Sequence, residues 1–327
     1  MTAPDPAPII ALLGGFRAAK FLMAATELGL FEALASSPAD LGELAGRTGL
    51  TRRAARICAD AMVTVGLIER DGDTYRNSPS AAAYLTGATE QDLRPFVRFS
   101  DRSSYPAWAG LAHALRHGPA SRITDLDPET QAVFSAGVEA LNAGPAAALA
   151  GSGHFARARR LLDIGGGTGS WSIAAAAANP HLLATVFELP QVAGLARKRI
   201  AEHGLSDRIG VAEGEVLTTA LPGGHDTCLL ANVVHCFSPA DNRRLLSTTR
   251  ASVTPGTRLL MVDYWTDPTH TVPPAAAMMA GEYALASDDG DVYSTEEATA
   301  WLTGTGWRLV DQNPLDGPKS VIVAEAV

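Results

Sequence analysis

The stretch LLDIGGGTG, residues 161–169, decides the fold that this sequence predicts. Its first four residues have the character of a short buried strand, the glycines that follow predict a turn, and residues 172–178 predict a helix. Strand, glycine-rich turn and helix form the first unit of a doubly wound α/β sheet. Glycines let the backbone approach a ligand, and the helix N-terminus presents free N–H groups. A structural tight turn is the alternative that the glycines alone leave open.

A second strand, residues 183–187, ends at Glu188, roughly twenty residues beyond the glycines. An acid at this spacing accepts hydrogen bonds from ribose hydroxyls in nucleotide-binding folds. A solvated charge at a strand end is the other interpretation of Glu188. Its coincidence with the glycine turn favours the binding role.

Further apolar segments alternate with helical ones, so the C-terminal half predicts an open Rossmann-like sheet. Ligands of such sheets bind beyond the carboxyl ends of the strands. Several polar residues stand at those ends, and we expect them to converge on one cleft. The expected further strands are residues 209–213, 226–234, 259–262, 307–310 and 320–324, and the polar residues are Asp163, Glu188, Glu215, His235 and Asp263.

The N-terminal half predicts a mainly α-helical domain. Residues 9–35 have the pattern of a long apolar helix that ends near residues 28–30. Asp40 and Thr51 are expected N-caps of two following helices, and residues 67–76 predict a hairpin. This order is typical of a winged helix. Arginines early in the second helix favour a DNA-binding regulator, whereas the net charge of -9 opposes phosphate binding and favours a dimerisation and substrate-capping module.

Residues 80–150 predict several short helices punctuated by prolines. The change of character near residue 159 then divides the chain into two expected domains. The first, residues 1–150, is the helical, winged-helix dimerisation and substrate-capping domain, and the second, residues 151–327, is the Rossmann-like catalytic domain.

Composition narrows the environment of the protein. Three cysteines without a CxxC pair indicate a reducing cytoplasm rather than a disulfide framework. Arg17 and Lys20 interrupt the apolar N-terminal stretch, so we expect neither a signal peptide nor a membrane span, and no membrane or nucleic-acid partner. His113 and His117 are four residues apart, but a solvated helix face explains them better than metal binding, and we expect no metal site.

Five segments in order, LLDIGGGTG, FELPQV, EGEVL, VVHCF and PGTRLLMVD, resemble the S-adenosylmethionine-dependent O-methyltransferases. Plant caffeate methyltransferases and bacterial polyketide-tailoring enzymes represent this family. The resemblance covers nearly the whole chain. It implies S-adenosylmethionine as cofactor, a small-molecule substrate, and a homodimer formed through the N-terminal domain.

The resemblance implies roles for the first cofactor-binding residues. Asp163, Gly165 and Gly167 match the family's glycine turn, which holds the methionine moiety of the cofactor. Glu188 matches the acid that binds the ribose, with a longer side chain and the same charge.

The later motifs imply the adenine site and the catalytic pair. Glu215 and Val216 match the segment that flanks adenine, and Phe237 matches the aromatic residue that stacks near it. His235 matches the general base and Asp263 the carboxylate that orients it. An ordinary histidine pKa near 6.5 would suit proton abstraction at neutral pH.

Three positions depart from the family pattern. Cys236 replaces a polar neighbour of the base, Ala231 stands where a lysine is common, and Val292 lies near the place of a second orienting glutamate. We expect transfer of a methyl group to the hydroxyl of an aromatic or polyketide-like natural product. Methylation of carbon or nitrogen, and a non-methylating relative that keeps the cofactor for structure, remain the alternatives.

Substrate selectivity is expected from the helices of residues 80–150 and from the segment around residue 280. Methionine and tyrosine side chains can line a flat aromatic pocket. Ordinary core packing explains the same residues equally well. The candidates are Met278, Met279, Glu282 and Tyr283.

Overall fold

The computed structural model describes residues 4–89, 91–122 and 126–327. The chain forms two compact units. The first comprises Met1–Pro106 and Glu129–Leu141, and the second comprises Ala107–Pro128 and Asn142–Val327. Helix α10 (Pro128–Gly151) contributes residues to both units. It ends one residue beyond residue 150, where the sequence predicts the domain boundary, and that boundary stays a prediction.

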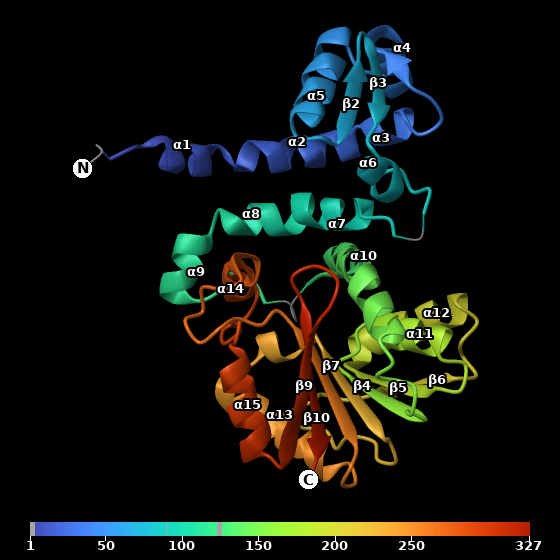
Figure 1. Cartoon of the computed structure of the whole chain (residues 1–327), viewed down its shortest axis with the longest axis vertical. Helices are drawn as coiled ribbons and strands as arrows, with labels where there is room; N and C mark the ends of the chain where they lie inside the picture. The colour runs from blue at the N-terminus through green and yellow to red at the C-terminus, as the bar shows by residue number, and fades with distance from the viewer. Residues whose placement is uncertain (1–3, 90, 123–125) are drawn as a thin grey trace. The chain divides into compact units, whose positions relative to one another are not determined.

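The first unit contains the predicted pair of capped helices followed by a hairpin (Figure 1). The Asp40 carboxylate accepts N–H bonds from Gly42 and Glu43, and the Thr51 hydroxyl accepts one from Ala54, so both predicted N-caps are confirmed. The elements are α1 (Ala7–Gly14), α2 (Phe16–Glu27), α3 (Leu30–Ala33), β1 (Ala39–Asp40), α4 (Leu41–Thr48), α5 (Arg52–Thr64), β2 (Ile68–Asp71), β3 (Thr74–Asn77), α6 (Pro79–Tyr84), α7 (Arg94–Phe99), the π-helix η1 (Ser100–Ser104) and the start of α8 (Tyr105–Trp108).

The predicted helix end near residues 28–30 is confirmed, because α2 ends at Glu27 and its C-cap is Leu28. The structure differs in dividing the expected helix into α1 and α2, and in placing the short helix α3 after the end. Gly29 adopts the left-handed conformation with φ of 69°, which glycine tolerates and which stops the helix.

Residues 7–27 are long and apolar enough to cross a membrane by length and composition alone, although they include Arg17 and Lys20. No other helix in the described residues is. The two basic residues therefore do not interrupt the apolar stretch enough to exclude a span, and the absence of a membrane span stays a prediction. Lys20 pairs with Asp101 of η1, so this stretch carries a partnered charge within the first unit.

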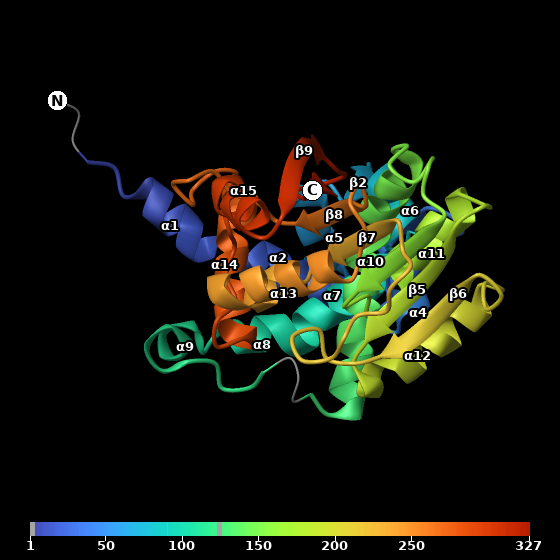
Figure 2. The same cartoon turned by 90° about the horizontal axis from the view of Figure 1, so that it is seen from below.

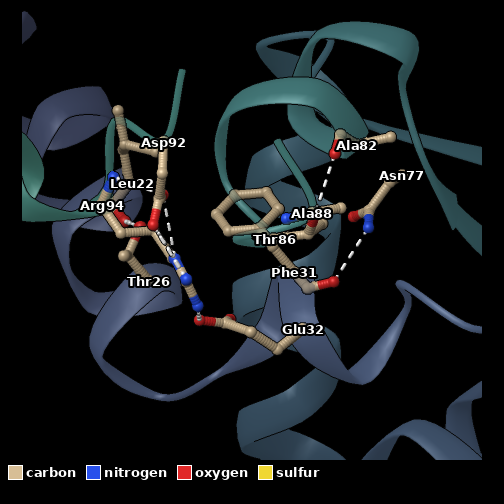
Figure 3. A network of polar contacts seen from close by, with 10 residues as sticks. All are labelled: Leu22, Thr26, Phe31, Glu32, Asn77, Ala82, Thr86, Ala88, Asp92 and Arg94. Carbon is tan, nitrogen blue, oxygen red and sulfur yellow. Dashed lines mark hydrogen bonds and ion pairs between the residues drawn. The ribbon is translucent and has the colours of Figure 1, made fainter. Parts of the chain in front are cut away.

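A network around Arg94 connects α3 to the segment before α7 (Figure 3). The Arg94 guanidinium donates to Glu32 at 2.7 Å and to Asp92 at 2.8 Å. Both carboxylates raise the pKa of Arg94, which stays charged. Nearby, the Asn77 amide donates to the Phe31 carbonyl at 2.8 Å and so connects β3 to α3. These partly buried contacts hold the first unit together around its apolar core.

The described part of the second unit is built on a seven-stranded sheet with strand order β6-β5-β4-β7-β8-β10-β9 (Figure 1). Strands β4 to β8 pair in parallel, and β10 lies antiparallel between β8 and β9. The strands are β4 (Arg160–Ile164), β5 (Leu183–Glu188), β6 (Ile209–Glu213), β7 (Thr227–Ala231), β8 (Arg258–Asp263), β9 (Trp307–Pro314) and β10 (Ser320–Ala326).

Helices cover both faces of this sheet, which confirms the doubly wound α/β class. One apolar core joins the sheet to α10, α11 and α12, and a second joins it to α13 and α15, which pack beside each other (Figure 2). The helices and short turns are α9 (Leu111–His117), α11 (Ser170–Ala178), α12 (Pro190–Glu202), the 3-10 turn η3 (Val234–Cys236), α13 (Pro239–Ala251), α14 (Pro274–Ala286) and α15 (Thr295–Gly304).

The expectation of only short helices over residues 80–150 is wrong for α10. This helix has 24 residues and contains Pro145 in its interior. Ala146 and Leu149 of α10 are buried in the second unit's core. Tertiary packing therefore outweighs the local cost of an internal proline.

Candidate functional site

The glycine turn after β4 lies where the sequence predicts it. The Gly165 N–H donates to the Phe187 carbonyl at 2.8 Å, and Gly165 and Gly167 have φ of 68° and 58°. A Cβ at Gly165 would lie 2.9 Å from a methyl of Val233, whereas a Cβ at Gly167 would meet nothing within 4 Å. Gly165 is therefore required for both its backbone conformation and its close packing, and Gly167 for conformation alone.

Asp163 lies at the end of β4 and is fully buried. Its Oδ2 accepts a 2.7 Å hydrogen bond from the Ser172 hydroxyl of α11, and its Oδ1 has no partner among the described residues. Burial raises the pKa of Asp163 to about 7, the Ser172 hydrogen bond opposes this rise, and Glu188 adds to it. A buried carboxylate oxygen without a donor is costly, and a ligand that donates to it would remove that cost.

Glu188 ends β5 beside the glycine turn and is also buried. Its carboxylate accepts N–H bonds from Gly167 and from Leu189, each at 2.7 Å. Burial raises the pKa of Glu188, and the two backbone donors counteract that rise. A carboxylate has about four acceptor positions, so two remain for the hydroxyls of a ligand.

The expected adenine residues lie after β6 and η3. Glu215 is half-buried and accepts the Leu217 N–H at 3.0 Å, and Val216 is buried. Phe237 is half-buried against the same apolar core as Val216. Val216 and Phe237 thus share a core, Glu215 lies next to Val216 in the chain, and the contact of all three with a ligand stays a prediction.

His235 and Asp263 form a direct pair, although 28 residues separate them. The His235 Nδ1 lies 2.8 Å from Asp263 Oδ1 and 3.0 Å from Oδ2. The side chains are 13% and 1% exposed, so water screens this pair little. Oδ1 also accepts the Tyr264 N–H at 2.9 Å, which fixes the carboxylate.

The environment of His235 differs from the ordinary one that the sequence argument assumed. Burial lowers the pKa of His235, but the Asp263 carboxylate and then Cys236 outweigh burial, and the pKa rises to about 10. The imidazole also stacks on Tyr283 of α14, with ring centroids 3.9 Å apart and an 8° angle between the planes. The expectation of an unperturbed pKa near 6.5 is therefore wrong.

The candidate substrate residues of α14 lie in different surroundings. Tyr283 is buried against His235, Met279 packs against the apolar cluster of Tyr264, Ala276, Tyr283 and Val292, and Met278 is 68% exposed.

The three departures from the family pattern are also placed. Ala231 is buried at the end of β7, Val292 is buried in the cluster just named, and Cys236 is half-buried beside His235. Within the described ranges, no group of three or more His, Cys, Asp or Glu residues could hold a metal ion.

Three residues near the site were missed by the sequence argument: Ser172, Asn232 and Lys319. Ser172 holds Asp163, and Lys319 donates hydrogen bonds to Asn142 and Asn232. Asn232 has φ of 59°. Asparagine is a residue that tolerates such a conformation, so its place three residues before His235 was the one available signal.

The site residues form two groups at one edge of the sheet, because the parallel strands β4 to β8 end there. Asp163, the glycine turn and Glu188 form the first group, and His235 with Asp263 forms the second. Val233 packs close to Gly165 and so connects the two groups. The first group fits a ligand that donates hydrogen bonds to buried carboxylates, and the second can hold or exchange a proton.

Comparison with known proteins identifies two family models in this chain. The O-methyltransferase domain model matches residues 105–308, and the O-methyltransferase dimerisation domain model matches residues 10–87.

Three curated relatives are similar over nearly their whole length. The tetracenomycin polyketide synthesis 8-O-methyl transferase TcmO of Streptomyces glaucescens is 31% identical, over 97% of this chain and 96% of the relative. The 3-hydroxy-5-methyl-1-naphthoate 3-O-methyltransferase of Streptomyces sahachiroi is 33% identical, over 92% and 89%. The N,N-dimethyltransferase OxyT of Streptomyces rimosus is 32% identical, over 97% and 96%.

A solved structure agrees with these relatives. PigF with S-adenosylhomocysteine superposes with a TM-score of 0.83 at 26% identity, over 98% of this chain and 100% of that one.

Proposed function

We propose, from the premise that this chain belongs to the O-methyltransferase family and is an S-adenosylmethionine-dependent methyltransferase, that it methylates an aromatic hydroxyl with His235 as general base. The observation that carries the proposal is the buried hydrogen bond between His235 Nδ1 and Asp263. This bond leaves Nε2 as the ring atom for exchanging a proton with an acceptor.

The cofactor supplies an electrophilic methyl group on a sulfonium. The acceptor oxygen forms a bond to that carbon while the carbon–sulfur bond breaks, and the hydroxyl proton passes to His235 Nε2. Alignment of acceptor and methyl contributes about 7–11 kcal/mol in well-oriented reactions. Base catalysis contributes about 10²–10⁴-fold. Asp263 then balances the charge of the imidazolium that forms.

Asp163, Gly165, Gly167 and Glu188 are the residues that we assign to the methionine and ribose parts of the cofactor. The unpartnered Asp163 Oδ1 and the free acceptor positions of Glu188 support this assignment. Glu215, Val216 and Phe237 complete the proposed site on the adenine side. The glycine turn gives the backbone room to approach the ligand.

We assign Tyr283 and Met279 to the acceptor site because they pack around His235 and its neighbours. Trp108 extends this group. Its indole N–H donates to Glu282 at 2.6 Å, and its ring covers Gly281, where a Cβ would lie 2.6 Å from it. Aromatic rings on and beside α14 suit a flat acceptor. The exposed Met278 is the weakest member of this proposed set.

The dimerisation domain supports a homodimer, which we propose as the working form. Helix α1 and the start of α2 carry exposed apolar side chains that a second copy would cover. Each of them is more than half exposed: Ile9, Ile10, Leu12, Leu13 and Phe16.

Transfer to nitrogen or carbon is the second candidate. The relative OxyT, an N,N-dimethyltransferase, favours it, as do the altered positions Cys236, Ala231 and Val292. A nitrogen or carbon acceptor can lose its proton after transfer, so it depends less on a base.

The test is a screen of hydroxylated naphthoates and other polycyclic phenols with methyl-labelled cofactor, followed by NMR of the product. We expect a methoxy product. His235→Ala should lower kcat by about 10²–10⁴-fold and leave cofactor affinity unchanged. Because the pKa of His235 is raised to about 10, wild-type kcat/KM should rise with pH from neutral towards that value. A new methyl on carbon or nitrogen, or full turnover by His235→Ala, would reject base-catalysed O-methylation.

A further inference from the structure

Lys319 is a buried cation that the reaction described above does not use. It directly precedes β10 and is 4% exposed. The sequence contains three lysines, and the other two, Lys20 and Lys198, are 40% and 76% exposed. Burial of an ammonium group is costly unless its protons are partnered.

The partners of Lys319 come from several separate elements. Its Nζ donates to Asn142 Oδ1 of α10 at 2.5 Å and to Asn232 Oδ1 just after β7. It also lies 4.8 Å from the ring centroid of Tyr264, just after β8. An ammonium has three donors, so two are held by amide oxygens and one side faces an aromatic ring.

Asn232 connects this cluster to the histidine. Its backbone is left-handed, with φ of 59°, and its N–H donates to the Val262 carbonyl of β8 at 2.9 Å. Such a conformation is uncommon and is maintained by surrounding contacts. The turn η3, which carries His235, begins two residues later.

A second connection leads to the carboxylate. Tyr264, beneath the ammonium, donates its N–H to Asp263 Oδ1. Ser320, the neighbour of Lys319, is the register partner of Asp263 in the β8–β10 ladder. The cation therefore lies beside the segments that carry both members of the His235–Asp263 pair.

We propose that Lys319 is a positioning residue, which orients His235 through Asn232 and offsets the charge of Asp263. This inference rests on the proposed role of His235 and deepens it. The hydrogen bonds to Asn142 and Asn232 fix the backbone that delivers the imidazole. The positive charge limits how strongly Asp263 retains a proton on His235.

The charge effect has a definite sign. Asp263 and Cys236 act directly on His235, and the Tyr283 ring stacks on it. Farther out, burial raises the pKa values of the Tyr264 and Tyr283 phenols, and Asp263 and Glu282 both add to that rise. Lys319 opposes the negative charge of Asp263. Burial lowers the pKa of Lys319 to about 8 and Asp263 counteracts this, so the ammonium form prevails at pH 7. Removal of this charge makes His235 more basic.

Two variants separate charge from hydrogen bonding. Lys319→Gln keeps amide donors without the charge, and Lys319→Met removes both. We would measure the protonation of the His235 imidazole as a function of pH by ¹⁵N NMR of histidine-labelled full-length protein. His235→Gln assigns the signal. Both variants should raise the pKa of His235 by about one unit. Lys198→Gln, on the exposed face of α12, should leave it unchanged.

Turnover adds a second readout. Lys319→Met should lower kcat more than Lys319→Gln, with KM for the cofactor unchanged. Asn232→Gly keeps the left-handed backbone but removes the acceptor of the Lys319 hydrogen bond. It should lower kcat, and it should change the pKa of His235 less than Lys319→Gln does. An unchanged pKa of His235 in folded Lys319→Gln would overturn the proposal. This outcome is distinct from failure of the base assignment, which His235→Ala turnover reports.

Discussion

Individual residues in this site combine burial with charge, at a cost to the fold. Asp163, Glu188 and Asp263 are carboxylates with less than a tenth of their surface exposed. Asp163 and Glu188 have raised pKa values because of burial. Ligand-binding and catalytic groups are commonly held in such environments.

Asp163→Asn should stabilise the ligand-free protein at pH 8. The raised pKa means that folded Asp163 binds its proton more tightly than the unfolded chain does. Its contribution to stability therefore declines as pH rises from about 4 to about 7. Asparagine does not titrate, so the free energy of unfolding of the variant should exceed that of wild type by about 2 kcal/mol at pH 8.

Urea unfolding at pH 5 and pH 8 measures this difference. The gain should be larger at pH 8 than at pH 5, and cofactor affinity should fall at both. An equal or smaller gain at pH 8 would show that Asp163 is not held as a buried acid.

At the residue level, the strand ends predicted that His235 and Asp263 lie at one edge of the sheet, and the structure places them 2.8 Å apart. Their catalytic roles come from the family resemblance and stay a proposal. The pKa of His235 was mispredicted because it depends on burial and on the close approach of Asp263 and Cys236. Lys319 gave no signal, since its partners Asn142 and Asn232 are distant in sequence.

At the scale of elements, local signals predicted the boundaries of short helices and failed for long ones. Asp40 and Thr51 cap their helices because a cap needs only neighbouring backbone N–H groups. Helix α10 continues through Pro145 because its apolar residues are buried against the sheet. The strand order also escaped prediction, as β10 inserts between β8 and β9.

The contact between the glycine turn and the segment after β7 yields a testable coupling. Gly165→Ala should weaken cofactor binding through backbone strain of about 1–2 kcal/mol and through collision with Val233. Val233→Ala removes the collision and should restore part of the affinity. Gly167→Ala is the matched control, because it has the same strain in open space.

Calorimetric titration with S-adenosylhomocysteine measures this double-mutant cycle. Val233→Ala should rescue Gly165→Ala and leave Gly167→Ala unchanged. Equal effects of Val233→Ala on both glycine variants would show that the packing of these two elements does not shape the site.

At the scale of the molecule, the family resemblance predicted the fold class and the cofactor. The S-adenosylmethionine-dependent methyltransferase fold and the dimerisation domain are both confirmed by the comparisons. The compact units follow packing, so residues 107–128 join the second unit although they precede the predicted boundary. The acceptor is not encoded in any motif of the cofactor site.

The exposed apolar residues at the N-terminus predict assembly. Leu13→Asp should convert a dimer into a monomer, because a buried unpaired charge at an interface is strongly unfavourable. Light scattering measures the mass, and Val65→Asp, at a partly exposed position on the first unit, is the control. A wild-type monomer that sediments with lipid vesicles would assign residues 7–27 to a membrane surface instead.

The central claim is that cofactor binding belongs to the Asp163–Glu188 group and proton exchange to the His235–Asp263 pair. Calorimetric titration with S-adenosylhomocysteine of wild type, Glu188→Gln and His235→Ala tests this division most directly. We expect wild type and His235→Ala to bind alike, and Glu188→Gln to bind at least about tenfold more weakly, because a charged acceptor is lost. Unchanged binding by Glu188→Gln, or lost binding by His235→Ala, would contradict the account.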